Sequence, residues 1–160
     1  MDFRAAVTTL QKGNVEFIVI GGLAATLHGS ARVTFDVDVL YRRSDENIAR
    51  LSTALTAIDP YLRGAPEGLP FRWDVPTIKA GLNFALATTI GPLDLLGEVV
   101  GVGQYEDAFP HARPMSVFGR DTRVLDLDWL IRSKRAAGRT KDLEVLAELE
   151  LLQELNENPK

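Results

Sequence analysis

Two short segments near the N-terminus constrain the fold more than any other part of this sequence. The first, FIVIGG at residues 17–22, is a run of aromatic and β-branched residues that ends in a glycine pair. The second, RVTFDVDVLY at residues 32–41, alternates with a period of two, which is the pattern of a β-strand. Such a strand would place Thr34, Asp36 and Asp38 on one face. The other face would carry the apolar residues Val33, Phe35, Val37 and Val39.

The remaining patterns predict helices and strands around one sheet. Helices are expected at residues 3–12, 22–29, 45–57, 126–137 and 141–155, the last one capped by Thr140. Further strands are expected in pairs, within 81–101 with a turn at Gly91-Pro92 and within 115–125 with a turn at 119–121. The Pro- and Gly-rich segment 59–76 is typical of a long loop or lid, and 156–160 of a frayed tail.

This order of elements predicts an α+β fold with a central mixed β-sheet packed with helices. The chain has 160 residues, which suits a single domain over 1–160 whose C-terminal helices cover 126–156. No apolar stretch approaches the roughly 20 residues that a membrane span needs. The first residues also lack the pattern of a secretory leader, so we expect a cytoplasmic protein without a membrane partner.

Composition excludes several kinds of site. The chain has no cysteine and two histidines, so thiolate chemistry is excluded and a histidine-based metal site is poorly supplied. Any metal should therefore be a hard cation held by oxygen. A net charge of -4 argues against broad, sequence-independent binding of nucleic acid. A local anion site remains open, because residues 131–141 hold five basic residues and no acid.

Three aspartates and a glycine pair indicate a site for a metal and a phosphate. Asp94 lies on a later predicted strand. Three carboxylates on one face of adjacent strands would repel one another by several kcal/mol unless a divalent cation neutralised them. A pair of Mg²⁺ ions held by shared carboxylates is one way to do so. Gly21 and Gly22 would let a phosphate approach backbone N–H groups at the start of the following helix. Arg32 and Thr34 flank the aspartates and are further candidates for phosphate contact.

The spacing of these motifs resembles that of the nucleotidyltransferase superfamily, which includes DNA polymerase beta and the minimal nucleotidyltransferases. The chain has IGG, thirteen further residues, then DVD, and a third aspartate on a later strand. It is closer still to the AbiEii-type nucleotidyltransferase-like proteins, many of them toxins of bacterial toxin-antitoxin systems. That resemblance is carried by GGLAATLHGSARVTFDVDVL, TIGPLDLL and LIRSKRAAGRTKDLEVL. It covers nearly the whole chain and is weakest over residues 58–80.

The resemblance implies a nucleotidyltransferase fold and a Mg²⁺-dependent enzyme. Such an enzyme would move a nucleoside monophosphate from an NTP to a hydroxyl of tRNA or protein, and an antitoxin would be its partner in a toxin-antitoxin pair. Asp36 and Asp38 would bind two Mg²⁺ ions, and Asp94 would be the third carboxylate, which deprotonates the acceptor hydroxyl. The basic positions implied to contact the triphosphate are Lys134, Arg139 and Lys141. The alternative is a non-catalytic member of the same fold that binds nucleotide or a partner protein. It is motivated by the larger relatives, which carry a further helical domain that helps hold the acceptor.

Structural roles compete with several of these assignments. Asp94 follows a Gly-Pro pair and could serve a turn. Asp142, whose function the RTKD string leaves open, would also suit the first turn of a helix. Cations near a helix C-terminus, as at Lys134, Arg135 and Arg139, interact favourably with the helix dipole without binding a ligand. The residues expected mainly to pack are His28, Phe71 and Trp73, of which the two aromatic residues in the long loop could instead stack on a base. A stripe on the last helix, formed by Leu143, Leu146, Leu149 and Leu152, is expected to dock on the domain, with a dimer or partner interface as the alternative.

Overall fold

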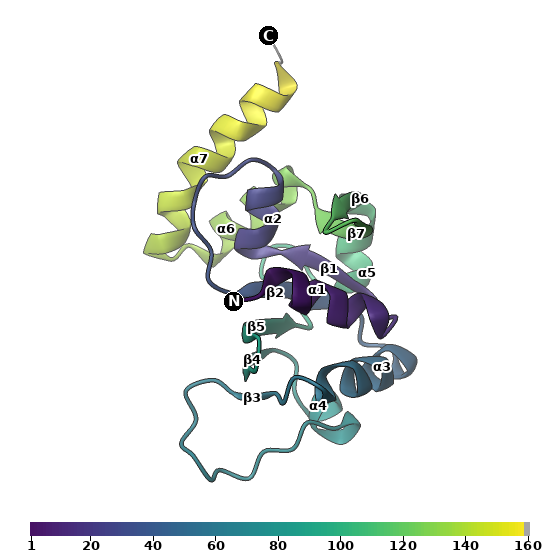
Figure 1. The fold of residues 1–160 in the computed structure, drawn as a ribbon. Coiled ribbons are helices and arrows are strands. Elements are labelled where there is room, and N and C mark those ends of the chain that lie inside the picture. The colour runs from purple at the N-terminus through teal and green to yellow at the C-terminus, as the bar shows by residue number, and fades with distance from the viewer. Residues whose placement is uncertain (159–160) are drawn as a thin grey trace.

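One mixed sheet of seven strands runs through residues 1–158, the part of the chain that the computed structural model describes (Figure 1). The strand order is β3-β4-β5-β2-β1-β7-β6. The pairs β2 with β5 and β1 with β7 are parallel, and the other neighbours are antiparallel. The strands are β1 Phe17–Ile20, β2 Val37–Tyr41, β3 Tyr61–Leu62, β4 Phe84–Thr88, β5 Gly91–Leu96, β6 Ala112–Val117 and β7 Arg120–Leu125. The predicted α+β class with a central mixed sheet is confirmed.

Helices pack around this sheet in two groups. α1 contacts α3, whereas α2 contacts α6, which in turn packs on α7. Figure 1 shows α7 extending beyond the rest of the molecule toward the C-terminus. The helices are α1 Phe3–Lys12, α2 Gly21–Leu27, α3 Asp45–Thr56, α4 Val75–Ala80, α5 Tyr105–Ala108, the 3₁₀ turn η1 Phe109–His111, α6 Leu127–Ala137 and α7 Thr140–Glu157. No helix within residues 1–158 is both long and apolar enough to cross a membrane.

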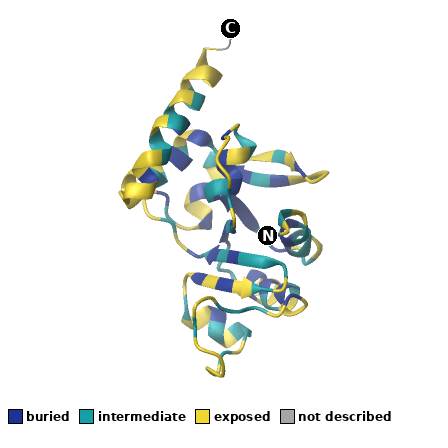
Figure 2. Cartoon of the chain, turned by 60° about the vertical axis from the view of Figure 1, so that its left-hand side comes forward, coloured by how far each residue is buried: buried dark blue, intermediate teal, exposed yellow. Residues whose placement is uncertain are grey.

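The alternation of side chains on the two central parallel strands separates the core from the polar face. Val37 and Val39 on β2 and Leu93 and Leu95 on β5 are fully buried. Residues between them point to the opposite face, because successive side chains of a strand alternate. Figure 2 shows buried positions gathered in the central strands, while much of α7 and of the segment between β3 and α4 is exposed.

Strand β2 is shorter than the predicted strand 32–41, and this part of the prediction is wrong. Residues 28–36 form an irregular segment in which Val33 and Phe35 are 77% and 76% exposed, so neither faces a core. Two neighbours end the pairing. On one side, β1 ends at Ile20, which pairs with Asp38. On the other side, the residue of β5 that would pair next is Pro92, which has no N–H to donate.

Two predicted turns are shifted by one or two residues. The turn between β4 and β5 lies at residues 89–90, and Gly91 and Pro92 begin β5 instead of forming the turn. The turn between β6 and β7 lies at Phe118 and Gly119, where both residues have positive φ values of 52° and 81°. Such left-handed positions make a two-residue turn that matches the twist of the flanking strands.

Helix ends and the long loop also differ from the prediction. Segment 59–76 contains β3 and the start of α4, whose N-cap Asp74 accepts a hydrogen bond from the backbone N of Thr77 at 2.9 Å. α7 begins at Thr140, so the N-cap is Arg139 and not Thr140. Of the predicted tail 156–160, the first two residues continue α7, and residues 159–160 lie outside the described part.

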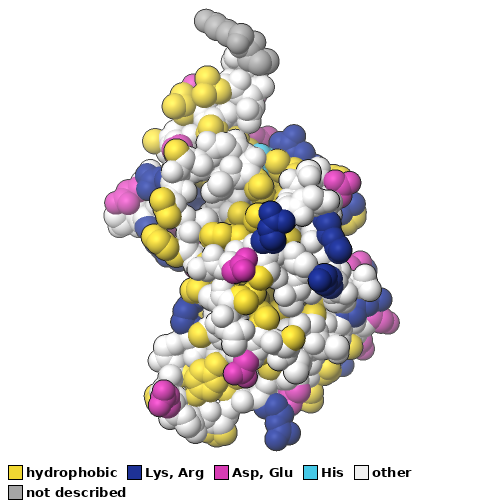
Figure 3. All heavy atoms as spheres, viewed as in Figure 1, with side chains coloured by type: hydrophobic (Ala, Val, Ile, Leu, Met, Phe, Trp, Pro, Cys, Tyr) yellow, Lys and Arg dark blue, Asp and Glu magenta, His cyan; other side chains and the backbone are white. Residues whose placement is uncertain are grey.

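Acidic and basic side chains are interspersed on the face seen in Figure 3, with no broad field of one sign. A protein that binds nucleic acid without regard to sequence relies on an extended basic surface.

Candidate functional site

Three carboxylates converge on the polar face of the two central parallel strands. Asp38 on β2 is the register partner of Asp94 on β5, and Asp36 lies in the segment just before β2. One carboxylate oxygen from each residue lies within 4.8 Å of the others. The structure thus brings together the three aspartates that the sequence singles out. Asp94 is inside β5, so it does not serve the turn before that strand.

Burial and mutual repulsion shift the titration of this cluster. Burial is the largest cause that raises the pKa of Asp38 to about 8; a hydrogen bond with Asp94 and the charges of Asp36 and Asp94 add to it, and Lys134 opposes it. Burial, followed by the charge of Asp94, also raises the pKa of Asp36. Without a divalent cation, Asp38 therefore holds its proton more tightly than an ordinary aspartate does.

The donor set fits a hard divalent cation. Carboxylate oxygens are the ligands that Mg²⁺ prefers, and a dication would compensate both the burial and the mutual repulsion that raise the two pKa values. Binding would then release the proton of Asp38, because a ligating carboxylate must be ionised. The cluster could hold Mg²⁺ through Asp36, Asp38 and Asp94.

Without divalent cations, the melting temperature of the wild-type protein should fall relative to that of the Asp38→Asn variant as the pH rises. The pKa of Asp38 is raised from its ordinary value of 3.8 to about 8, so the folded state holds this proton more tightly than the unfolded chain. The resulting stabilisation is complete below pH 3.8 and is lost as the pH rises to about 8. Melting curves in a chelator between about pH 5 and pH 9 would measure it. Parallel curves for the two proteins would contradict the expectation.

The glycine pair lets the chain pass close to the carboxylates. Gly21 directly follows β1 and has a φ of +64°, which L-residues with a side chain rarely adopt. A Cβ atom at Gly21 would collide with Oδ2 of Asp38, and one at Gly22 would lie 2.6 Å from Oγ1 of Thr34. Thr34 in turn donates a hydrogen bond of 3.2 Å to the carbonyl of Asp36. The two glycines and Thr34 are therefore packed directly against the acidic cluster.

Asp142 holds two of the predicted cations beside the cluster. Its side chain is 1% exposed; Nζ of Lys134 lies 3.3 Å from Oδ1 and Nε of Arg139 lies 2.6 Å from Oδ2. Burial raises the pKa of Asp142, but the hydrogen bonds and charges of Arg139 and Lys134 outweigh it and lower that pKa. Lys134 also lowers the pKa of Asp38, and the charge of Asp38 contributes to the raised pKa of Arg139. Asp142 therefore positions both cations within electrostatic reach of Asp38.

Two other predicted phosphate contacts lie elsewhere. The guanidinium of Arg32 donates to the carbonyl oxygen of Glu144 at 2.9 Å and lies 4.0 Å from the carboxylate of Glu148. It therefore binds α7 and not the three aspartates of the cluster. Lys141 is exposed in the first turn of α7, and its side chain makes no hydrogen bond or ion pair with any residue from 1 to 158. The structure therefore shows neither of these cations in contact with the cluster.

Most residues expected to pack do so. Nε2 of His28 is hydrogen-bonded to the carbonyl of Leu125 at 2.8 Å, and Trp73 packs edge-on against Phe84. Phe71 makes a similar edge contact with Tyr61. Of the leucine stripe on α7, Leu149 is buried, Leu146 and Leu152 are half-buried, and Leu143 is 56% exposed. The stripe thus docks α7 through three of its four leucines.

Sequence reasoning missed Arg63, the residue that follows β3. Its Nη2 lies 2.6 Å from Oδ1 of Asp94. The two residues are 31 positions apart, and the arginine is one of two in a Pro- and Gly-rich segment, so no spacing in the sequence signals the contact. The pairing arises because β3 lies beside β4, and β4 beside β5.

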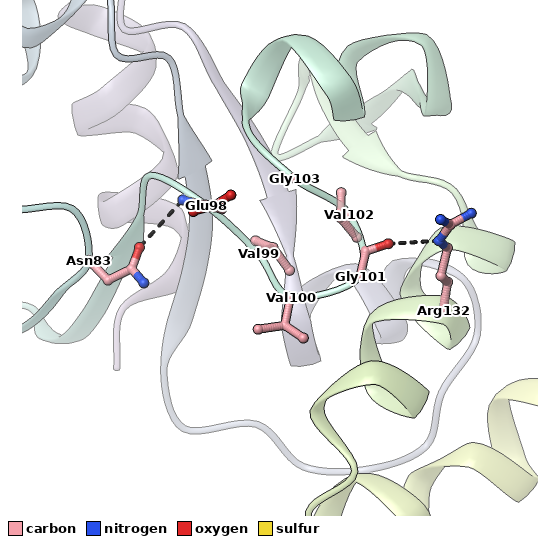
Figure 4. A pocket seen from close by; sticks show the side chains of 8 residues that line it. All are labelled: Asn83, Glu98, Val99, Val100, Gly101, Val102, Gly103 and Arg132. Atoms are coloured by element: carbon pink, nitrogen blue, oxygen red, sulfur yellow. Dashed lines mark hydrogen bonds between the residues drawn. The ribbon is translucent and has the colours of Figure 1, made fainter.

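A half-open cavity of about 430 Å³ lies between residues 98–103 and Arg132 of α6 (Figure 4). Nε of Arg132 donates to the carbonyl of Gly101 at 2.7 Å, and Oδ1 of Asn83 accepts from the backbone N of Gly97 at 2.9 Å. None of the three aspartates of the cluster lines this cavity. It is therefore separate from the acidic site.

No protein-family model and no curated protein matches the chain, but solved structures do. A candidate nucleotidyltransferase from Thermotoga maritima is 16% identical with a TM-score of 0.55, over 99% of this chain and 97% of that one. ANT(2″)-Ia in complex with adenylyl-2″-tobramycin is 14% identical with a TM-score of 0.56, over 91% and 89%. An antigenic nucleotidyltransferase-like protein from Paracoccidioides brasiliensis is 17% identical with a TM-score of 0.53, over 92% and 75%. The chain therefore has the nucleotidyltransferase fold.

Proposed function

We propose that this protein is a Mg²⁺-dependent nucleotidyltransferase, which moves a nucleoside monophosphate from an NTP to a hydroxyl acceptor and releases pyrophosphate. The observation that carries the proposal is the convergence of Asp36, Asp38 and Asp94 within 4.8 Å beside a glycine pair. The shared fold supports it, although fold alone does not specify a reaction. Within residues 1–158, these three form the one acidic group close enough to share a cation.

The residues would divide the work as follows. Asp36, Asp38 and Asp94 would hold two Mg²⁺ ions, which when bound neutralise triphosphate charge and activate the attacking oxygen. Gly21 and Gly22 would leave room for the phosphates beside the cluster. Positive charge for the triphosphate would come from two side chains that Asp142 positions, Lys134 and Arg139.

The transfer itself would be a displacement at the α-phosphorus. The acceptor oxygen forms a bond to that phosphorus while the bond to the bridging oxygen breaks, and pyrophosphate leaves with the electron pair. Asp94 would take the proton of the acceptor hydroxyl. A carboxylate in this position must be ionised and free on at least one oxygen when the acceptor arrives.

The acceptor and the biological setting are proposed from resemblance. The likeness of the sequence to AbiEii-type proteins supports a tRNA or protein acceptor, and a toxin role with an antitoxin partner in the cytoplasm. ANT(2″)-Ia has been solved with adenylyl-2″-tobramycin, which makes an aminoglycoside hydroxyl a third class of acceptor to test. A non-catalytic, nucleotide-binding role is the second candidate function. It is favoured by one observation, the pairing of Asp94, the proposed base, with Arg63.

Pyrophosphate release with each of the four NTPs and Mg²⁺ tests the proposal, with total tRNA, tobramycin or no acceptor added. We expect release with at least one NTP, dependent on Mg²⁺ and increased by the correct acceptor. Binding of Mg-NTP in a calorimeter without any release would favour the second candidate. If the protein neither bound Mg-NTP nor released pyrophosphate, both functions would be rejected.

A further inference from the structure

The backbone of Arg63 is hydrogen-bonded to β4, and its side chain reaches across β4 to the acidic cluster. Its N–H donates to the carbonyl of Ala85 at 2.9 Å, and Ala85 is the register partner of Asp94 in the β4–β5 pair. The guanidinium then meets Oδ1 of Asp94 at 2.6 Å. The contact is therefore fixed at its base by the sheet and not by the exposed loop that follows.

The guanidinium is a permanent cation at the place where a divalent cation would bind. Arginine cannot lose its proton in a protein, so its charge is present at every working pH. Among residues 1–158, it is the one cation that forms an ion pair with any of the three carboxylates. Its charge also lowers the pKa of Asp36, against the larger effect of burial. Arg63 thus partly compensates the cluster without a metal.

The surroundings of Arg63 allow its side chain to leave Asp94 without disturbing the core. Its side chain is 36% exposed, and the loop after it is mostly exposed. Gly64 and Gly68 have positive φ values and open space around them. Figure 1 shows the segment between β3 and α4 as a wide arc at the edge of the molecule. Rotation about the side-chain bonds of Arg63 therefore moves the charge while the backbone anchor stays in place.

We propose that Arg63 is an exchangeable counter-ion: it occupies Asp94 in the metal-free protein and moves to the phosphates of the nucleotide when metal and NTP bind. The inference rests on the proposed function and extends it to the regulation of the same site. Once divalent cations take the carboxylates, the nearest strong anion for a guanidinium is the triphosphate, whose oxygens match its forked donors. The exchange also releases the oxygen of Asp94 that the acceptor proton needs.

Calorimetric titration of the Arg63→Met variant tests this exchange, because methionine keeps an unbranched apolar stem and removes the charge. Without nucleotide, the variant should bind Mg²⁺ about fivefold to tenfold more tightly than wild type, since a competing cation is gone. With an NTP analogue whose α–β bridge resists cleavage, it should bind Mg-nucleotide about tenfold more weakly, since a phosphate contact is lost. Arg72→Met, an exposed arginine on the same loop, should change neither affinity.

The opposite signs of the two changes separate exchange from a purely structural role. If the Arg63→Met variant bound both Mg²⁺ and the Mg-nucleotide analogue more weakly, or both as tightly as wild type, the exchange would be overturned. Binding of both ligands by the wild-type protein would still uphold the proposed function. Wild-type protein that binds neither Mg²⁺ nor the Mg-nucleotide analogue would reject the proposed function and the exchange together. Circular dichroism of each variant controls for folding.

Discussion

The Asp38→Asn substitution is expected to lower the rate of nucleotidyl transfer on the order of a thousandfold and to abolish Mg²⁺-dependent nucleotide binding. Asp38 lies beside Asp94 in the parallel register and is the most strongly shifted carboxylate of the cluster. An amide of the same shape cannot supply the negative charge that a cation requires. It does resemble the protonated form that Asp38 adopts without a cation, so the fold should persist.

Pyrophosphate release and calorimetric binding of Mg-NTP would measure both effects. The matched control is Asp121→Asn, which removes an exposed carboxylate on β7 outside the cluster and should behave as wild type. An Asp38→Asn protein with more than about a tenth of the wild-type rate would remove Asp38 from the proposed metal site, because loss of a ligand should cost far more.

The Asp142→Asn substitution is expected to lower the free energy of unfolding by about 2 kcal/mol. The carboxylate of Asp142 is 1% exposed and accepts hydrogen bonds from Lys134 and from the side chain and backbone N–H of Arg139. Loss of its charge leaves both cations without their counter-ion next to a buried amide. The cost stays moderate because the Arg139 side chain is itself 58% exposed and regains water.

Urea denaturation of wild type and variant would give this difference directly. Glu154→Gln, which changes an exposed carboxylate on the same helix, should shift the midpoint by little. A midpoint equal to that of wild type for Asp142→Asn would mean that the buried ion pairs contribute no net stability. A second readout is activity, which should also fall because Lys134 and Arg139 lose the group that positions them.

Local patterns in the sequence account for much of the fold. The apolar runs and the glycine pair predict elements within a few residues of their observed ends. The alternation of DVDV also indicates correctly that Asp36 and Asp38 lie near each other. Such signals are readable because each depends on neighbours in the chain.

Contacts between distant segments could not be predicted in the same way. Arg32 stands next to the aspartates in sequence, yet its guanidinium reaches Glu144 at a separation of 112 residues. Residues 32–36 have the alternation of a strand in the sequence. They lack a partner strand in the structure because β1 ends at Ile20 and Pro92 of β5 has no N–H to donate. The pairing of Arg63 with Asp94 needs three strands in the correct order. Each of these depends on tertiary structure, which periodicity does not encode.

The parallel register of β2 and β5 also bears on the fidelity of folding. Leu93 and Leu95 alternate with Asp94, so a slip of one residue would turn the carboxylate into the core and push both leucines out to the polar face. A chain that mispairs at this point would expose an apolar patch at the same time as it lost its acidic centre. Cellular quality control that captures proteins with exposed leucines would therefore also remove the copies that lack the acidic cluster.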